Sequence, residues 1–156
     1  MKTILTPVDF SSATRGVLAA ALDLARATGG RVVLLHAVQN PVITTDYGLT
    51  AEVLQETIAA NEGAARRQIA HLEKLVADKG VPVTTRLAGG FAAGNILDCA
   101  RKTRASYIVL GSHGHTAFYD LLVGSTTNAV LKRAPCPVVV VPSPRKKRRA
   151  GKPGGV

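Results

Sequence analysis

The sequence predicts an α/β domain in three layers, a parallel sheet with helices packed on both of its faces. Two observations lead to this prediction. Five short runs of β-branched or apolar residues are spaced along the 156-residue chain, and segments with apolar residues at helical spacing lie between them. Strands that alternate with helices are joined by right-handed crossovers, which give a parallel sheet covered on both faces. At this length, and with 46% hydrophobic residues, we expect one compact domain.

Each of the five runs is expected to form one strand. They are TILTPV (3–8), RVVLLHAV (31–38), VPVTTRL (81–87), SYIVLG (106–111) and PVVVV (137–141). Apolar residues at three- and four-residue spacing predict helices over residues 17–25 and 54–76, and shorter helices over about 93–104 and 125–133. Ser11 or Ser12 should cap the first helix, while Gly29, Gly30 and Gly80 suit helix ends. Residues 39–50 form a long connection, either a flap or a solvated loop.

The net charge of +10 is concentrated at the end of the chain. Residues 1–141 carry 14 Lys and Arg against all 10 Asp and Glu, a net charge of +4, and six further cations lie in PSPRKKRRAGKPGGV. This end is rich in Pro, Gly and like charges, so we expect a domain at residues 1–142 and a basic disordered tail at 143–156. The tail could bind polyanions weakly, although neither interleaved aromatics nor a recognition motif accompanies the charge.

Two further features of the sequence concern the cellular location of the protein and the state of its cysteines. No apolar stretch reaches the roughly 18 residues of a membrane span, and the N-terminus lacks the layout of a signal peptide, so we expect a cytoplasmic protein. Cys99 and Cys136 are too few and too scattered for a disulfide framework or a metal site. They are interpreted as buried free thiols.

Glycines and hydroxyls gather in GSHGHTAFYDLLVGSTT (111–127), between the fourth strand and the fourth helix. In open parallel sheets, ligands bind at the carboxyl ends of strands where the strand order reverses, after the first and fourth strands. Gly111 and Gly114 lack a Cβ, so we expect positive φ there and N–H groups turned toward an anion. Gly124 and the three hydroxyls after it would begin a helix whose N–H groups and dipole favour phosphate. The pattern predicts a polyphosphate cradle; glycines that merely make turns and cap a helix are the alternative.

The spacing G-x2-G-x9-G-[ST] from Gly111 to Ser125 resembles the ATP-binding signature of the universal stress protein family. TILTPVDFS (3–11), LLHAV (34–38), GFAAGNIL (90–97) and APCPVVVVP (134–142) are similar to that family as well, so the resemblance covers nearly all of residues 1–142. It implies a Rossmann-like, five-stranded parallel sheet of order 3-2-1-4-5 and, because the signature is intact, the ATP-binding version of the family. It also implies a homodimer. In that order residues 137–141 form an edge strand without charge, through which two copies could pair.

The resemblance assigns roles to individual residues. Asp9 is similar to the acidic residue near the adenine and ribose, with Pro7 and Val8 offering an apolar shelf and backbone groups. Asp9 could instead cap the first helix. Val38 looks like the residue whose backbone contacts adenine, and is otherwise a strand terminus. The ribose and α-phosphate would be lined by Gly111, Ser112, His113 and Gly114, and the β- and γ-phosphates by Gly124, Ser125, Thr126 and Thr127.

The same loop departs from the family in several residues. His113 and His115 stand where many relatives carry arginine or lysine, so positive charge near phosphate would depend on pH. Tyr119 and Asp120 add a phenol and a carboxylate to the spacer. Asp120 could assist Mg²⁺, but we expect it to face water. The pair of histidines without a third ligand would leave zinc under-coordinated.

The expected function is a regulatory protein that binds ATP with Mg²⁺ and changes conformation or partner affinity with occupancy. A slow ATPase or nucleotidyl-transfer enzyme is the alternative, and nucleic-acid association through the tail is a weaker one. The phosphate loop has no lysine, and Asp9 and the histidines are the sole candidate bases, so efficient hydrolysis is not expected. On the sequence alone, deleting residues 143–156 should leave ATP affinity almost unchanged.

Overall fold

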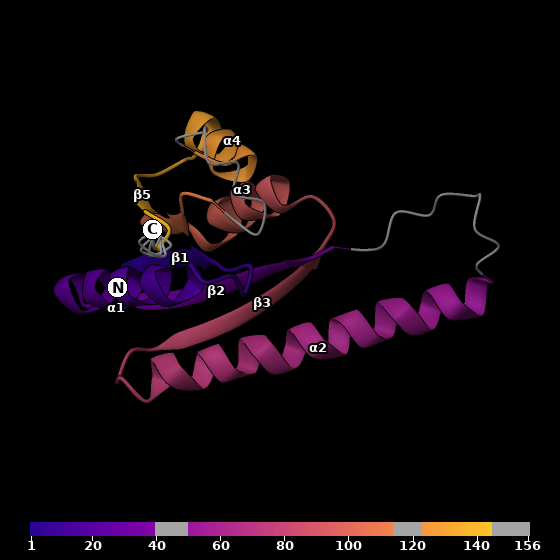
Figure 1. The fold of residues 1–156 in the computed structure, drawn as a ribbon. Coiled ribbons are helices and arrows are strands. Elements are labelled where there is room, and N and C mark those ends of the chain that lie inside the picture. Colours follow the sequence, from indigo (N-terminus) through magenta and orange to yellow (C-terminus); the bar gives the residue numbers. More distant parts are fainter. Residues whose placement is uncertain (40–49, 114–122, 145–156) are drawn as a thin grey trace, which may run out of the picture.

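The computed structural model describes residues 1–39, 50–113 and 123–144, in which strands and helices alternate (Figure 1). The strands are β1 (Thr3–Pro7), β2 (Arg31–Val38), β3 (Val83–Gly89), β4 (Tyr107–Gly111) and β5 (Val138–Val141). The helices are α1 (Thr14–Thr28), α2 (Ala51–Ala77), α3 (Ala92–Thr103) and α4 (Ser125–Arg133). The predictions for the connection after β2, for Gly114, His115, Tyr119 and Asp120, and for the tail from Arg145 onward lie outside the described residues.

The five strands form one parallel sheet in the order β3-β2-β1-β4-β5, which confirms the predicted fold class. The chain builds outward from β1 to β3 and then returns to place β4 on the other side of β1. The strand order therefore reverses between β1 and β4. In such sheets the crossover helices leave in opposite directions at this point, which opens a crevice at the carboxyl ends of the two strands.

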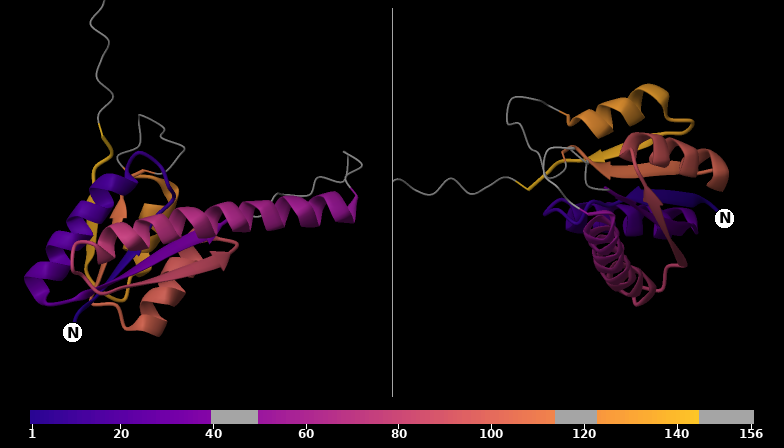
Figure 2. Two further views of the ribbon diagram at one scale, coloured as in Figure 1. Left: turned by 90° about the horizontal axis from the view of Figure 1, so that it is seen from below. Right: turned by 90° about the vertical axis from the view of Figure 1, so that its right-hand side faces the viewer.

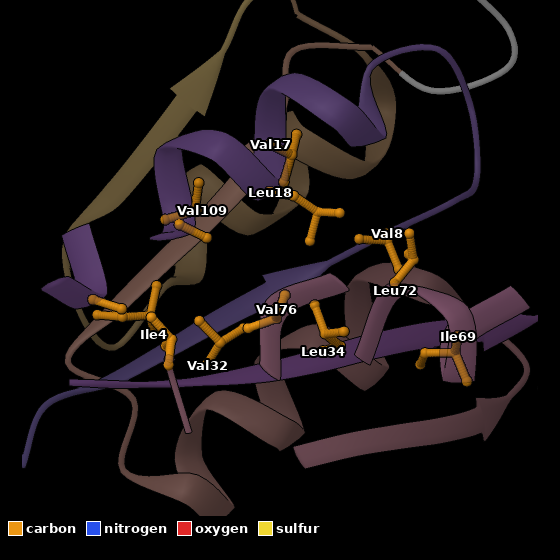
Figure 3. Packing of buried hydrophobic residues seen from close by; sticks show 13 residues of the cluster. Ile4, Val8, Val17, Leu18, Val32, Leu34, Ile69, Leu72, Val76 and Val109 are labelled. Atoms are coloured by element: carbon orange, nitrogen blue, oxygen red, sulfur yellow. The ribbon is translucent and has the colours of Figure 1, made fainter. Parts of the chain in front are cut away.

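Alternate residues of the central strands point into two separate cores. On one face, Ile4, Val32 and Val109 pack against α1 and the second half of α2 (Figure 3). On the other face, their neighbours Leu5 and Val33 pack against α3 and α4. Burial of one such side chain is worth about 1.5–3 kcal/mol. Because β1 is covered on both faces, its first four residues are all buried, Thr3 and Thr6 included.

Helix ends agree with the prediction at the glycines but not at the serines. Gly29 ends α1 in the left-handed region, with φ of 59°, and Gly80 follows α2 with φ of 74°. The prediction of a Ser11 or Ser12 cap is wrong, because the N-cap residue is Ala13 and no side chain caps α1. The Ser11 hydroxyl accepts the Ala13 N–H (3.3 Å) in the turn that precedes the helix.

Helix α2 is longer than the sheet it covers. Its buried residues, Ala65, Ile69, Leu72 and Val76, all lie in its second half. The first half extends past the ends of the strands (Figure 2), with Leu54 and Ile58 half-buried and Val53 44% exposed. Half of this helix is therefore held by the fold, and half continues beyond it.

Two remaining expectations concern the cysteines and the membrane. Cys99 is buried in α3 and Cys136 is half-buried before β5, and both are free thiols. Burial raises the pKa of each. Within the described ranges, no helix has the length and apolar character needed to cross a membrane.

Candidate functional site

A cavity of about 630 Å³ opens at the carboxyl edge of the sheet, where the strand order reverses. Its walls come from the ends of β1, β2 and β4 and from the first turns of α1, α3 and α4. The volume lies within the usual range for small-molecule and cofactor sites. Nine residues predicted from the sequence line it: Pro7, Val8, Asp9, Gly111, His113, Gly124, Ser125, Thr126 and Thr127.

The β1 side of the cavity is fixed by contacts with β2. The Val8 N–H donates to the Leu35 carbonyl (2.8 Å), and the Val8 carbonyl lies 2.8 Å from His36 Nδ1. Because a carbonyl can only accept, His36 Nδ1 carries the hydrogen. The same imidazole lies against the ring of Phe10, with 4.2 Å between centroids, and Phe10 has φ of 60°. The turn from β1 to α1 thus depends on His36 as well as on its own residues.

Asp9 lies in this turn and its carboxylate is partly engaged there. Its Oδ1 accepts the Ser11 N–H at 3.0 Å. Of the two predicted roles for Asp9, the role as a helix cap is not observed. The carboxylate instead stabilises the turn before the helix by accepting the N–H two residues later, and no side chain caps the first turn of α1. Asp9 also lines the cavity, so the ligand role stays a prediction.

Gly111, at the end of β4, has a different reason to be glycine from the one predicted. The expectation of positive φ is wrong for this residue, because it completes a regular strand and does not appear among the left-handed residues. A Cβ at Gly111 would lie 3.3 Å from the Ala13 Cβ and 3.3 Å from the His113 carbonyl oxygen. The missing side chain lets β4 approach the start of α1 and leaves room at the cavity floor.

The start of α4 offers backbone N–H groups to the cavity. Its N-cap residue is Gly124, which has no side chain to occupy the amides of the first turn. Ser125 is exposed, whereas Thr127 is 4% exposed and its hydroxyl donates to the Gly111 carbonyl at 2.7 Å. The three hydroxyls predicted to act together are therefore not equivalent, since that of Thr127 ties α4 to β4.

Ser112 connects this region to the end of the sheet. Its carbonyl accepts the Gly124 N–H (2.7 Å), and its N–H donates to the Val141 carbonyl (2.8 Å). Its hydroxyl lies 3.1 Å from His113 Nδ1 and accepts the Ser143 N–H at 3.2 Å. Ser112 is 9% exposed and does not line the cavity. It therefore acts as a supporting residue, whose hydrogen-bond contacts position the cavity residues His113 and Gly124.

The structure differs from the sequence-based site along β2. Val38 does not line the cavity, and its carbonyl accepts the Gly90 N–H at 3.3 Å. Its neighbours Ala37 and Gln39 do line it, together with His36. The carboxyl end of a strand beside β1 was a signal for this region, but the residues that line the cavity there, Leu35, His36, Ala37 and Gln39, follow no simple alternation. Further wall residues that the sequence analysis missed are Ala13, Thr14, Val17, Leu35, Ala92, Ile96 and Leu110.

Metal ligands do not gather in the part of the chain that the structure describes. No group of three His, Cys, Asp or Glu side chains there could hold an ion. His113 lies at the cavity, and His115 is outside the described ranges.

Fold and cavity together define an open parallel α/β protein with a ligand site at the reversal of its strand order, bordered by an uncapped helix start. The model of the universal stress protein family matches residues 1–142, and the chain belongs to this family. It is 30% identical over 149 residues to universal stress protein MJ0531 of Methanocaldococcus jannaschii, covering 94% of this chain and 85% of the relative. It is 35% identical to a universal stress protein of Thermus aquaticus, covering 90% and 98%.

Solved structures support the same assignment. The structure of protein MJ0577 of M. jannaschii superposes with a TM-score of 0.80 at 26% identity, covering 93% of this chain and 98% of that one. More distant is the universal stress protein of Archaeoglobus fulgidus in complex with dAMP, with a TM-score of 0.63 at 21% identity, covering 90% and 97%. At that distance the likeness shows a shared fold.

Proposed function

We propose that this protein binds ATP with Mg²⁺ in the cavity at the carboxyl edge of the sheet. Occupancy of the site would change its conformation or its affinity for a partner, in a regulatory stress-response role. The observation that carries the proposal is the meeting of the β1 end, the β4 end and the uncapped start of α4 around one space of about 630 Å³.

The phosphates belong at the start of α4. The first N–H groups of a helix have no partner within the helix, and the dipole adds positive potential at that end. Ser125 is exposed there and can donate its hydroxyl to a distal phosphate oxygen. Mg²⁺ would bind mainly to phosphate oxygens and water, which suits a site whose described residues include no cluster of carboxylates.

The nucleoside belongs between β1 and β2. Asp9 can accept a hydrogen bond from a ribose hydroxyl, and Pro7, Val8 and Ala37 provide an apolar wall with backbone groups at its rim. The dAMP complex of the A. fulgidus protein shows that this fold can accept an adenine nucleotide. The choice of ATP for this chain rests on its own residues.

Isothermal titration of the full chain with ATP and Mg²⁺ tests the proposal. Saturable binding with one site per chain is expected, along with weaker binding of GTP and release of bound nucleotide on adding EDTA. The absence of saturable heat for any adenine nucleotide would refute it. Phosphate release in the same sample tests the slow-ATPase alternative, for which Asp9 and His113 are the candidate bases in the described wall.

A further inference from the structure

All four helices end at the edge of the sheet that lies opposite the cavity. Each helix runs back along the sheet, so the last turns of α1, α2, α3 and α4 lie where β2, β3, β4 and β5 begin. Contacts join these ends: the Lys2 carbonyl accepts the Arg31 N–H at 2.8 Å, and the Arg26 side chain donates to the Lys79 carbonyl at 3.1 Å. The N-terminus lies on the same side of the molecule as the ends of α1 and α2 (Figure 2, left). The strand starts and helix ends thus form one continuous surface.

The net positive charge of the described chain lies at this surface. The described residues include 14 Lys and Arg and eight Asp and Glu. Ten of these cations but four of the carboxylates belong to the last two turns of the helices, to the residues just after them, or to the strand starts. The remaining four cations and four carboxylates balance each other over the rest of the described surface.

Most cations of this surface have no carboxylate beside them. Lys74 forms an ion pair with Asp78 at 3.2 Å, and Arg101 forms one with Asp98. Seven further cations are exposed and form no ion pair within the described ranges: Lys2, Arg26, Lys79, Lys102, Arg104, Lys132 and Arg133. We call these seven residues the basic edge.

Arg104 shows that helix stability alone does not account for the basic edge. Cations near a helix C-terminus interact favourably with the helix dipole. Arg104, however, ends α3 in the left-handed region, with φ of 49° and ψ of 52°, where α1 has Gly29. The strain of this backbone in a residue with a Cβ is larger than the usual gain from the dipole. The chain therefore keeps a cation at a position where glycine would be more stable.

The basic edge is too broad for a single small anion. Its residues come from the start of β1, at the centre of the sheet, and from the helix ends that precede both outermost strands, β3 and β5. Five strands about 4.8 Å apart span roughly 19 Å. Cations spread over such a width match a partner with many phosphates, and each one neutralised releases counterions.

The other side chains of this surface favour a nucleic-acid duplex among the polyanions. Single strands bind by stacking their bases on aromatic side chains, but Tyr107 at the start of β4 packs against the first core. Membrane surfaces bind helices that lie flat with an apolar face, whereas the helices here present their ends. A duplex needs only cations that contact its backbone.

We propose that the basic edge binds the phosphate backbone of double-stranded nucleic acid without sequence preference. This function goes beyond nucleotide binding, does not depend on it and uses the opposite end of the sheet. Its affinity should fall steeply with salt, because phosphate contacts release counterions.

The test measures binding of a mixed-sequence DNA duplex to the full chain by fluorescence anisotropy at several salt concentrations. In the edge variant Lys79, Lys102, Lys132 and Arg133 are changed to glutamine. Its duplex affinity should fall by about tenfold or more, and the slope of log affinity against log salt should become shallower by about three. A parent that binds no duplex, or an edge variant that binds as the parent does, would overturn the inference.

A matched control changes the same number of charges elsewhere and leaves the rest of the chain intact. Its four exposed residues, each changed to glutamine, are Arg15, Arg66, Arg67 and Arg86. This variant has the same net charge as the edge variant and should keep duplex affinity within about twofold of the parent. Equal losses in the two variants would show a general effect of net charge and would contradict a localised surface.

Arg104→Gly separates binding from stability. The melting temperature should rise by about 2–5 °C, because glycine adopts the left-handed conformation without strain. Duplex affinity should fall by about two- to threefold, since one cation is lost. A more stable variant with the parent's duplex affinity would exclude Arg104 from the binding surface.

Two further measurements distinguish this inference from its alternatives. Vesicles of phosphatidylserine and phosphatidylcholine should not bind at salt concentrations where the duplex does. Vesicle binding that exceeds duplex binding and is lost in the edge variant would overturn the inference in favour of an anionic membrane. Titration with ATP should give the same affinity for the parent and the edge variant. Duplex binding without ATP binding would refute the proposed function alone, and ATP binding without duplex binding would refute this inference alone.

Discussion

At the scale of single residues, the start of α4 shows that chemically similar side chains next to each other in the sequence can have different roles. Ser125, Thr126 and Thr127 are consecutive hydroxyls, and the sequence gives no reason to separate them. In the structure, the Thr127 hydroxyl reaches the Gly111 carbonyl, while Ser125 stays exposed at the mouth of the cavity. The direction of the helix decides this division, because residues 100° apart around its axis meet different neighbours.

Substitution of Ser125 should therefore change ATP affinity, whereas substitution of Thr127 should change the stability of the fold. Ser125→Ala should weaken ATP by about two- to tenfold, with little change for AMP or in melting temperature, because one ligand hydrogen bond is lost. Thr127→Val should lower the free energy of unfolding by about 1–2 kcal/mol, since the Gly111 carbonyl loses its partner. Calorimetric titration and thermal melts of both variants check this. A Ser125 variant with unchanged ATP affinity would place the phosphates elsewhere.

Cys99 provides a prediction about pH. Desolvation raises the pKa of its thiol above the ordinary value of 9.0 in the folded chain, with Arg86 and Lys102 opposing the shift. Well below pH 9 the thiol is neutral in both states and contributes no pH dependence. Above that pH the unfolded chain loses the proton first, so the free energy of unfolding should fall as pH rises.

Denaturant melts between pH 7 and 10 measure the effect, with Cys99→Ala as the comparison. The difference in stability between parent and variant should shrink as pH rises above 9. The thiol should also resist alkylation until the chain unfolds, because only the thiolate reacts and Cys99 is 6% exposed. Rapid alkylation of Cys99 in the native protein would contradict its burial.

At the scale of elements, strands and helices were largely predictable, and their exact ends were not. The helix predicted over 125–133 matches α4, because Gly124 before it and the apolar spacing within it are local signals. Strand β3 was expected at 81–87 and is Val83–Gly89. Its last residues, Ala88 and Gly89, have weak strand preference and are held by pairing with Ala37 and Val38 of β2. Because the pairing residues of β2 are distant in the sequence, the local sequence around β3 could not predict where the strand ends.

The candidate site, too, has parts that the sequence could predict and parts that it could not. The glycine motif and the β1 end could be predicted, since each is a short stretch with its own chemistry. The contributions of Ala37 and Gln39 could not be predicted, because they depend on how the end of β2 and the residue after it lie against the cavity. The Ser112–Ser143 contact joins residues 31 positions apart, and two neutral serines give no sequence signal of it.

The junction of α1 and β2 yields a test of backbone packing. A Cβ at Gly30 would lie 2.8 Å from the Lys2 carbonyl oxygen, a backbone atom that belongs to the β1–β2 pairing. Gly30→Ala should therefore cost about 1–3 kcal/mol. Gly16→Ala, within α1, is the control, since its Cβ would meet only the Val141 side chain at 3.4 Å and should stabilise the helix by about 0.5–1 kcal/mol. Equal stabilities for the two variants in urea melts would refute the assignment of the clash.

At the scale of the whole molecule, the sheet has an edge strand that suits a second copy. β5 pairs with β4 on one side only in the described sheet, and Val139 is 38% exposed while Val138 and Val140 pack into the second core. We predict a homodimer joined through residues 137–141, because an uncharged edge strand readily pairs with its own copy about a twofold axis.

Val139→Lys should shift the chain from dimer to monomer in sedimentation equilibrium. The lysine would lie on the accessible side of β5 and would face its own copy across the twofold axis. Val140→Lys is less suitable, because Val140 is half-buried against the second core and a charge there would also disturb the packing. A parent chain that sediments as a monomer at about 50 µM, where an interface of micromolar affinity should hold, would exclude this assembly.

The uneven support of α2 gives the molecule regions of unequal local stability. Its first 13 residues, 51–63, lie just at the length where an isolated helix is marginal in water. Two local features favour them: the Thr50 hydroxyl accepts the Val53 N–H at 3.4 Å, and Glu52 lies in the first turn. The packed half supplies a nucleus from which these turns can extend, so they should fray from Thr50 inward and not unfold with the core.

Native-state hydrogen exchange should accordingly show protection that declines along α2 from Val76 toward Ala51. Amides near Ile69 and Leu72 should exchange only through global opening, and those before Gly63 through local opening. Thr50→Ala should speed exchange in the first two turns and leave the second half unchanged. Uniform protection along the whole helix would instead mean that the projecting turns are covered in solution, and the same measurement on the Val139→Lys monomer would tell whether a second copy covers them.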